Sequence, residues 1–393
     1  MPESALRAAG RAAFIPFAPP ALGDEEIAEV VDTLRSPWIT TGPKTRRFED
    51  AFAQRLSAPA AVALNSCTAA LHTALTCLGV GPGDEVITTP LTFAATVNVI
   101  EHVGARPVLV DVTPDTLNID PAEVARAVTP RTRVILPVHY AGHPVDLDAL
   151  RAAARQRITI LEDAAHALPA RYRGRLIGSD TNPVAFSFYA TKNLTTGEGG
   201  MLTAHDDLVE RARVVALHGM SRDAWRRYER GGSWRYDVLL PGFKYNMTDI
   251  QASIGLHQLA KLDAFHRRRA EVAAAYTAAF AHNPALEVPT VRPDVDPAWH
   301  LYVLRLRPEA LRIGRDQFIG ELTDRNIGTS VHFIPVHLHP YYRDKYGLAP
   351  DALPVAVENF LRMLSLPLHP RLTDADVSDV IEAVLDVIQR HRR

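Results

Sequence analysis

Between Ala61 and Phe188 the sequence alternates short, β-branched apolar runs with stretches of helical spacing. This alternation indicates crossover units that feed a mostly parallel sheet, and therefore an α/β fold. Strands are predicted at Ala61–Leu64, Glu85–Thr88, Pro107–Asp111, Arg133–Val138, Ile158–Glu162 and Val184–Phe188, and helices at Thr68–Leu78, Phe93–His102, Pro121–Ala127 and Leu147–Arg155. Ligands of such folds bind beyond the carboxyl ends of the strands, so functional residues are expected there.

The remainder of the chain predicts a second, smaller unit. A long helix is expected from about Asp249 to Phe280, because this stretch holds no proline and only Gly255 weakens it. A strand is expected at Leu301–Leu306, and an amphipathic helix near the end begins with the Thr373 and Asp376 of a capping box. A chain of 393 residues should divide into about two domains, which we place at residues 15–265 and 266–393.

The charge and cysteine content of the chain indicate which kinds of partner it can bind and in which cellular compartment it works. The 43 Lys and Arg residues nearly balance the 45 Asp and Glu residues, so no overall field favours nucleic acid or a membrane surface. Two cysteines, Cys67 and Cys77, are too few for a disulfide framework. No apolar run approaches the roughly 20 residues that span a bilayer. We therefore expect a cytoplasmic protein whose anionic ligands are held locally.

A lysine follows the last predicted strand of the alternating region. The run Ser187–Gly200 reads SFYATKNLTTGEGG, so Lys192 stands at a strand end before a glycine-rich turn. A lysine placed there can meet a bound aldehyde, and its pKa falls readily when it is partly buried. A solvated loop lysine is the common alternative.

A carboxylate and a strand-to-helix turn accompany this lysine. Asp163 directly follows the strand Ile158–Glu162, where its charge could pair with a protonated pyridine nitrogen. His166, three residues later, could cover a ring face or simply pack. At Asn65–Leu71, where a strand turns into a helix, free amides and the helix dipole suit a phosphate, although a serine or threonine there is usually only a cap.

Together these motifs resemble those of the DegT/DnrJ/EryC1/StrS family of nucleotide-sugar aminotransferases, which have fold type I and use pyridoxal 5′-phosphate. The resemblance extends from about Pro16 to the C-terminal helix, and includes the runs Trp38–Lys44 and Pro241–Asp249. It implies a large cofactor-binding domain with a mostly parallel central sheet, and a smaller C-terminal α+β domain.

The resemblance also implies roles for particular residues. Lys192 would be the catalytic residue and hold the cofactor as a Schiff base. Asn246 would reach the phosphate from the partner subunit, which implies a homodimer with shared active sites. The other residues implied to bind the cofactor are Thr68, Ala69, Phe93, Asp163, His166 and Ser187. Cys67 departs from the glycine of many relatives, which could alter the approach of the phosphate.

The expected substrate residues come from three separate runs of the chain. They are Thr40, Thr41, His218, His332, His337 and Tyr341. The histidines of the run Val331–Tyr342 also raise the possibility of a metal, because His337 and His339 would share one face of a strand. No carboxylate or cysteine lies beside them, so we expect them to line the sugar pocket and expect no metal.

A basic and aromatic segment carries Arg226, Arg227, Arg230 and Arg235. It could bind a nucleotide diphosphate, or it could be a solvated loop; single-stranded nucleic acid is a more distant possibility.

The activity implied is transamination of a nucleotide-linked keto sugar, with L-glutamate as amino donor and 2-oxoglutarate as product. The runs Gly242–Asp249 and His218–Met220 resemble members that aminate C4 of a 4-keto-6-deoxyhexose, while C3-specific members share every cofactor residue. Related dehydratases on this scaffold have a histidine in place of the aldimine lysine. The presence of Lys192 therefore argues against a dehydratase. A non-catalytic regulator would carry a fused DNA-binding module, for which no residues remain.

Overall fold

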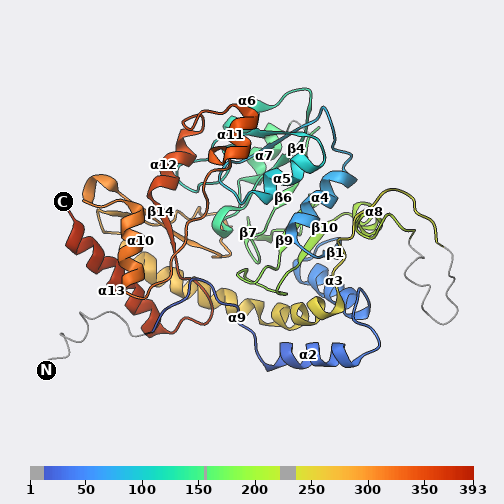
Figure 1. Ribbon diagram of the computed structural model, residues 1–393, viewed down its shortest axis with the longest axis horizontal. Coiled ribbons are helices and arrows are strands. Elements are labelled where there is room, and N and C mark those ends of the chain that lie inside the picture. The colour runs from blue at the N-terminus through green and yellow to red at the C-terminus, as the bar shows by residue number, and fades with distance from the viewer. Residues whose placement is uncertain (1–12, 155–156, 222–235) are drawn as a thin grey trace.

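In a computed structural model, residues 13–154, 157–221 and 236–393 are described, and they form a central sheet with helices on both faces, shown in Figure 1. The strands are β1 (Ala60–Leu64), β2 (Glu85–Thr88), β3 (Arg106–Leu109), β4 (Thr132–Leu136), β5 (Thr159–Ile160), β6 (Glu162–Asp163), β9 (Val184–Ser187) and β10 (Gly200–Ala204). One half has the order β1-β10-β9-β6 and the other β3-β2-β4-β5. An isolated parallel bridge between Val138, just after β4, and Asp163 of β6 joins the two halves into one sheet.

The sheet is mostly parallel, as predicted. Strand β2 pairs in parallel with β3 and β4, β4 with β5, and β6 with β9. Strand β10 is the exception, because it pairs antiparallel with both β1 and β9. Since β1 and β9 run in the same direction, their carboxyl ends lie at one edge of the sheet together with that of β6.

Residues of one strand alternate between two cores, as the period of a β-strand requires. On one face, Ile87 and Phe186 pack with apolar residues of α3 (Pro43–Leu56), α7 (Leu147–Ala153) and α9 (Asp249–Phe280). On the other face, Val86 and Ala185 pack with α4 (Cys67–Cys77), α5 (Ala95–His102) and α8 (Asp206–Ala216). Helix α6 (Pro121–Ala127) contributes Val124 to the first core.

The C-terminal region has a core of its own. A three-stranded antiparallel sheet of β11 (Leu286–Glu287), β13 (Tyr302–Leu306) and β14 (Met363–Leu366) packs with α10 (Arg315–Asp324) and α13 (Asp374–His391). The remaining elements are α2 (Asp24–Arg35), β7 (Arg171–Tyr172), β8 (Arg175–Leu176), β12 (Val295–Asp296), α11 (Pro340–Tyr346), α12 (Pro354–Arg362) and the 3₁₀ turns at Tyr140–Gly142, Pro308–Ala310 and Val336–Leu338.

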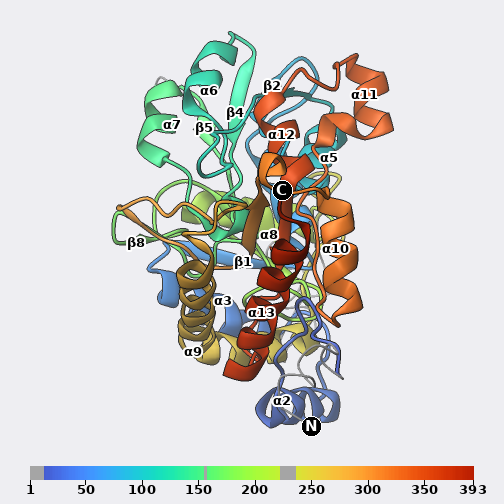
Figure 2. The ribbon, with the colours of Figure 1, turned by 90° about the vertical axis from the view of Figure 1, so that its left-hand side faces the viewer.

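Helix α9 connects the two regions. It packs against α2 and α3 near its start and against α13 farther along. Figures 1 and 2 show it in the lower part of the molecule, with α2 below it. Thr248 and Gln251 form a capping box at its start, and Thr373 and Asp376 form the expected one at the start of α13. The boundary predicted at residues 265 and 266 falls inside α9, which is continuous, and the division into two domains stays a prediction.

In the described part of the chain, no helix is long and apolar enough to cross a membrane.

Candidate active site

Lys192 lies in the turn after β9, partly buried among residues of the large sheet. Its main-chain amide donates to Tyr189 O at 2.9 Å, and the amide of Thr196 donates back to Phe188 O at 2.9 Å, which closes the turn. Burial lowers the pKa of Lys192 to about 8, while the charges of Cys67 and Asp163 act in the opposite direction. Near neutral pH the amine is therefore far more often uncharged than that of an ordinary lysine.

Asp163 ends β6 and is 5% exposed. Its Oδ2 accepts a hydrogen bond from Thr96 Oγ1 at 2.8 Å, and its Oδ1 accepts one from the Ala165 amide at 3.0 Å. Burial raises the pKa of Asp163, and among the described residues no cationic side chain forms an ion pair with it. A buried carboxylate in this state favours a cationic partner, and a protonated pyridine nitrogen would supply one.

Aromatic rings lie close to these two groups. The ring of Phe93 is 65% exposed and its centroid lies 6.1 Å from that of Phe333. The ring of His166 is buried and stacks on Phe333 at 5.8 Å. Burial, with the nearby charge of Lys192, holds the pKa of His166 well below its usual value, so this ring is neutral. Flat, uncharged rings of this kind suit the faces of a planar cofactor.

The expected phosphate-binding residues meet at the start of α4. Ser187 of β9 is the pairing partner of Gly200, which pairs with Leu64 of β1 just before the turn into α4. A Cβ atom on Gly200 would lie 2.5 Å from the Cys67 nitrogen, so glycine allows β10 to pass close to this turn. The Ala69 amide, however, already donates to Ser66 Oγ at 3.1 Å, so it is used by the helix cap.

Three of the expected substrate residues lie in the run Val331–Tyr342, and they are placed differently. His332 is close enough to Lys192 for the amine's charge to act on it, and burial lowers the pKa of His332 to about 4. Its Nδ1 lies 2.9 Å from Ser365 Oγ, and its ring stacks on Phe17. Tyr341 is 56% exposed on α11, where the Lys345 amine approaches its ring.

The predicted strand around His337 and His339 is wrong. Residues Val336–Leu338 form a 3₁₀ turn, and His339 precedes α11, because Pro335 and Pro340 prevent a regular strand. His337 is fully buried, with Nε2 facing Pro350 O at 3.2 Å, so its ring offers no surface to a ligand in this chain. The two histidines therefore do not share one strand face.

The remaining expected residues form a second cluster beside the end of β1. Asn246 pairs with Leu64 in an isolated bridge, and its side-chain amide donates to Thr41 Oγ1. Lys244 Nζ donates to Asn246 Oδ1 at 2.6 Å. Thr40 accepts from the Asp249 amide at 3.0 Å, and His218, which is exposed, donates its amide to Phe243 O at 2.7 Å.

Several residues near Lys192 carried no recognised signal in the sequence. Thr96 holds Asp163 and itself lies 2.7 Å from Thr92 Oγ1, a pair at helical spacing at the start of α5. The ring centroid of His300 lies 4.4 Å from that of His166. His300 comes from a distant part of the chain, so its position depends on tertiary contacts. The basic segment with Arg226, Arg227, Arg230 and Arg235 lies outside the described residues.

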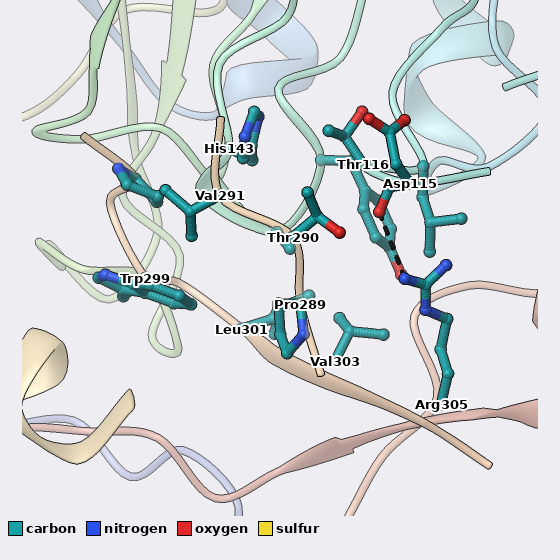
Figure 3. Close-up of a pocket in the computed structure, with 14 residues that line it drawn as sticks. Asp115, Thr116, His143, Pro289, Thr290, Val291, Trp299, Leu301, Val303 and Arg305 are labelled. Carbon is teal, nitrogen blue, oxygen red and sulfur yellow. Dashed lines mark hydrogen bonds between the residues drawn. The ribbon is translucent and has the colours of Figure 1, made fainter. Parts of the chain in front are cut away.

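A cavity of about 40 Å³ is lined in part by Trp299 and Leu301, the two chain neighbours of His300, and its lining residues do not include Lys192 or Asp163. Figure 3 shows Trp299, Leu301 and Val303 along one side of it and Arg305 reaching toward Asp115. A volume of this size has room for one or two water molecules, so a sugar nucleotide would not fit.

With this geometry in place, comparison with known proteins identifies the chain. The sequence profile of the DegT/DnrJ/EryC1/StrS aminotransferase family matches residues 20–385. The chain belongs to this family. A spore coat polysaccharide biosynthesis protein, SpsC of Bacillus subtilis, is 52% identical over 379 residues, which cover 96% of this chain and 97% of that protein.

Solved structures agree with this membership. Spr1654 of Streptococcus pneumoniae, a candidate sugar aminotransferase, matches in its PMP form with a TM-score of 0.91 and 38% identity over 96% of this chain and 99% of that one. Its PLP form matches with a TM-score of 0.89. The sugar aminotransferase CalS13 of Micromonospora echinospora matches with a TM-score of 0.86 and 33% identity over 95% of this chain and 99% of that one.

The protein is therefore a sugar aminotransferase of fold type I whose cofactor is pyridoxal phosphate. The residues around Lys192 fit this cofactor, since the buried Asp163 carboxylate forms no ion pair with a described side chain and the rings of Phe93 and His166 flank the same region.

Proposed function

We propose that this enzyme transfers the amino group of L-glutamate to a nucleotide-linked keto sugar, at C4 of a 4-keto-6-deoxyhexose, and that it does so in the cytoplasm. The observation that carries the proposal is the juxtaposition, at one sheet edge, of a partly buried lysine of lowered pKa with a buried carboxylate that forms no ion pair with any described side chain. The likeness of the runs at His218–Met220 and Gly242–Asp249 to C4-specific members supports the position on the sugar.

The chain's own groups would bind the cofactor at three points. Lys192 Nζ would attach it covalently, and Asp163 would hold the proton on its pyridine nitrogen. Thr68 and Ser187 would contact the phosphate at the start of α4, where unpaired helix amides favour an anion. The Ala69 amide would join them only if the phosphate displaced Ser66 Oγ, which now caps it.

The chemistry of the bound cofactor is an electron-accepting ring that stabilises negative charge at the donor Cα. Once the amino group of the donor had displaced it from the cofactor, Lys192 Nζ would take the proton from the donor Cα as base and deliver it to the cofactor C4′ as acid. In the second half-reaction it would take a proton from C4′ and deliver it to the sugar carbon that receives the amine. Its lowered pKa suits both roles, because the amine is readily deprotonated and can be protonated again near neutral pH. His166 and Phe93 would hold the ring plane and exclude water.

Thr40, Thr41 and Asn246 would act across a dimer interface. The Asn246 side chain is hydrogen-bonded to those of Thr41 and Lys244, and the Thr40 carbonyl accepts from the Asp249 amide, away from Lys192 of the same chain. A second copy of the chain would bring such a cluster to the site of its partner. His332 and Tyr341 would line the sugar side of the site, while the burial of His337 limits it to a supporting position.

The test combines a spectrum with a substrate panel. Purified protein should show a visible absorption band that L-glutamate removes and a nucleotide keto sugar restores. Borohydride reduction followed by peptide mapping should place the cofactor on Lys192. Turnover with UDP-, dTDP- and GDP-linked 3-keto and 4-keto sugars, with NMR of the product, should place the new amine on C4. An amine on C3, or turnover by Lys192→Ala, would contradict the proposal.

A further inference from the structure

His300 lies between the C-terminal region and the lysine turn. It precedes β13 by two residues, yet its ring is buried against His166, with 4.4 Å between ring centroids. Its Nδ1 lies 3.2 Å from Oδ1 of Asn193, the residue that directly follows Lys192. One side chain therefore contacts both the residue next to the reactive lysine and a ring expected to cover the cofactor.

The hydrogen bonds of Asn193 determine the tautomer of His300. The Asn193 Nδ2 atom donates to the carbonyl oxygens of Leu168 at 2.9 Å and Ala298 at 2.7 Å. Carbonyl oxygens only accept, so the amide nitrogen must face them and Oδ1 must face His300. Because Oδ1 also only accepts, the bond requires a proton on His300 Nδ1. His300 is neutral, since burial, with the charges of nearby groups, lowers its pKa well below the usual value.

The main chain around His300 is fixed on several sides. The Ala298 amide donates to Gly142 O at 2.8 Å and the Leu301 amide to Ala141 O at 3.2 Å. The buried guanidinium of Arg269 donates to the carbonyls of Trp299 and His300, and to that of Leu368 at 2.6 Å.

Gly142 permits the close approach. It has φ +93°, and a Cβ atom there would lie 2.8 Å from His166 O and 3.1 Å from the His300 nitrogen. On the other side of this segment, Trp299 and Leu301 line the small cavity of Figure 3. A segment held at so many points can hold a side chain in one orientation.

We propose that His300 is a positioning residue of the aminotransferase, whose Nδ1–H bond to Asn193 and contact with His166 hold Lys192 and the His166 ring in their working arrangement. This inference rests on the proposed role of Lys192. No described hydrogen bond or ring contact joins His300 to the Lys192 amine or the Asp163 carboxylate. It therefore acts through Asn193 and His166. Reacting groups must be held to within about half an ångström, and a misplacement of about 1 Å can cost 100-fold in rate.

The experiment compares two substitutions that differ in which ring nitrogen they replace. In His300→Asn the side-chain amide nitrogen takes the place of Nδ1, whereas in His300→Gln it takes the place of Nε2. His300→Asn should keep kcat within about threefold of wild type, and His300→Gln should lower kcat by at least about tenfold with little change in the KM for glutamate. Urea unfolding of the cofactor-free variants measures any purely structural loss.

A spectroscopic readout that does not depend on turnover accompanies these rates. The pH at which the visible band of the lysine-bound cofactor changes should shift in His300→Gln and stay at the wild-type value in His300→Asn. Asn193→Ala should shift it in the same direction, and the double variant should lose no more than Asn193→Ala alone, because His300→Gln breaks a hydrogen bond that Asn193→Ala already removes. This second variant keeps the test open if His300→Gln fails to fold.

The outcomes separate the two proposals. Equal losses in the Asn and Gln variants that follow the unfolding free energy, or additive losses in the double variant, would overturn the role of His300 while the wild-type band still maps to Lys192. Absence of a band at Lys192 in the wild type would instead overturn the proposed function itself.

Discussion

At the scale of single residues, the environment of Asp163 sets its function. The side chain is almost fully buried and accepts hydrogen bonds from Thr96, Ala165 and the Cys67 thiol. Those from Thr96 and Ala165 lower its pKa against the larger effect of burial. A carboxylate so placed is prepared for a positive charge that arrives with the ligand. Its value to the enzyme should therefore appear in the rate more than in the stability of the cofactor-free protein.

The first prediction concerns this charge. Asp163→Asn keeps the shape of the side chain and removes the anion, so kcat should fall by about 10²- to 10³-fold, as for loss of one prearranged electrostatic partner. Thr96→Val removes only the hydroxyl that supports Asp163, and should lower kcat by about tenfold or less. Steady-state rates at saturating glutamate and keto sugar measure both. A Thr96→Val loss as large as that of Asp163→Asn would contradict this ranking.

The second prediction follows from the pKa of Lys192, about 8 instead of 10.5. Only the neutral amine attacks an aldehyde, so the rate at which pyridoxal phosphate attaches to the cofactor-free protein should rise about tenfold per pH unit below pH 8 and level off above it. Stopped-flow absorbance over a range of pH measures this rate, with Lys192→Ala as the control that should show no attachment. If the attachment rate kept rising up to pH 10, Lys192 would have the pKa of an ordinary lysine and the prediction would be wrong.

At the scale of elements, the strand β10 brings the parts of the site together, since it lies between β1 and β9 and passes the start of α4. Gly200 makes that passage possible. A Cβ atom there would lie 2.4 Å from the Ser66 carbonyl carbon and 2.5 Å from the Cys67 nitrogen, both main-chain atoms that cannot easily move. The shape of the expected phosphate site therefore depends on one missing methyl group.

The third prediction is that Gly200→Ala weakens both fold and cofactor binding. Moving β10 away from α4 should lower the unfolding free energy by about 1–3 kcal/mol, the usual cost of overpacking. It should also raise the Kd for pyridoxal phosphate, because Ser187 and the α4 amides would separate. Gly320→Ala is the matched control: nothing lies within 4 Å of its Cβ position in α10, so the change should be neutral or slightly stabilising. Urea unfolding and cofactor titration measure the two effects.

Most of the sheet could be predicted because each of its strands before β10 lies in a short apolar run that is recognisable in the local sequence. The six predicted strands correspond to β1, β2, β3, β4, β5 with β6, and β9, and α6 and α9 have the predicted bounds. Strand β10 was missed because Gly199 and Gly200 indicate a turn, whereas its pairing with β1 and β9 is made over long sequence separations. The strand predicted at His337 is wrong because Pro335 and Pro340, on either side of the run, disfavour a regular strand.

The candidate site was predictable to a similar extent. Lys192 and Asp163 stand at strand ends that are recognisable in the sequence, whereas the role predicted for Ser187 comes only from the family resemblance. Thr96, Asn193 and His300 could not be assigned roles, since their function comes from contacts between side chains on different elements, such as Asp163 with Thr96. The capping of Ala69 by Ser66 was likewise invisible, because a phosphate site and a helix cap have the same sequence signature.

At the scale of the whole molecule, the residues expected to act on cofactor and substrate form two groups within one chain. One group surrounds Lys192. The other holds Thr40, Thr41 and Asn246 and is fixed by the Asp249 carboxylate, which accepts hydrogen bonds from the amides of Gly42 and Lys44 at 2.9 and 3.0 Å. In a dimer with two-fold symmetry, the Lys192 group of each chain would lie beside the Asn246 group of its partner. The dimer would then hold two complete sites, each built from both chains.

The fourth prediction tests that arrangement by mixing two defective subunits. Lys192→Ala removes the amine of its own chain, and Asn246→Ala removes the asparagine that the proposal assigns to the partner's site. In a heterodimer of the two, one site would have an intact Lys192 from one chain and an intact Asn246 from the other. Random assembly of equal amounts should therefore restore roughly a quarter of the wild-type rate, well above either variant alone.

The control for the mixing experiment is the pair Lys192→Ala and Asp163→Asn. Both residues belong to the same site, so every site in their heterodimer keeps one defect and no activity should return. Co-purification through two different affinity tags isolates the heterodimer, and its rate is compared with both homodimers. If Asn246 served the site of its own chain, the mixture with Lys192→Ala would gain nothing, because the only intact lysine would still lack its asparagine.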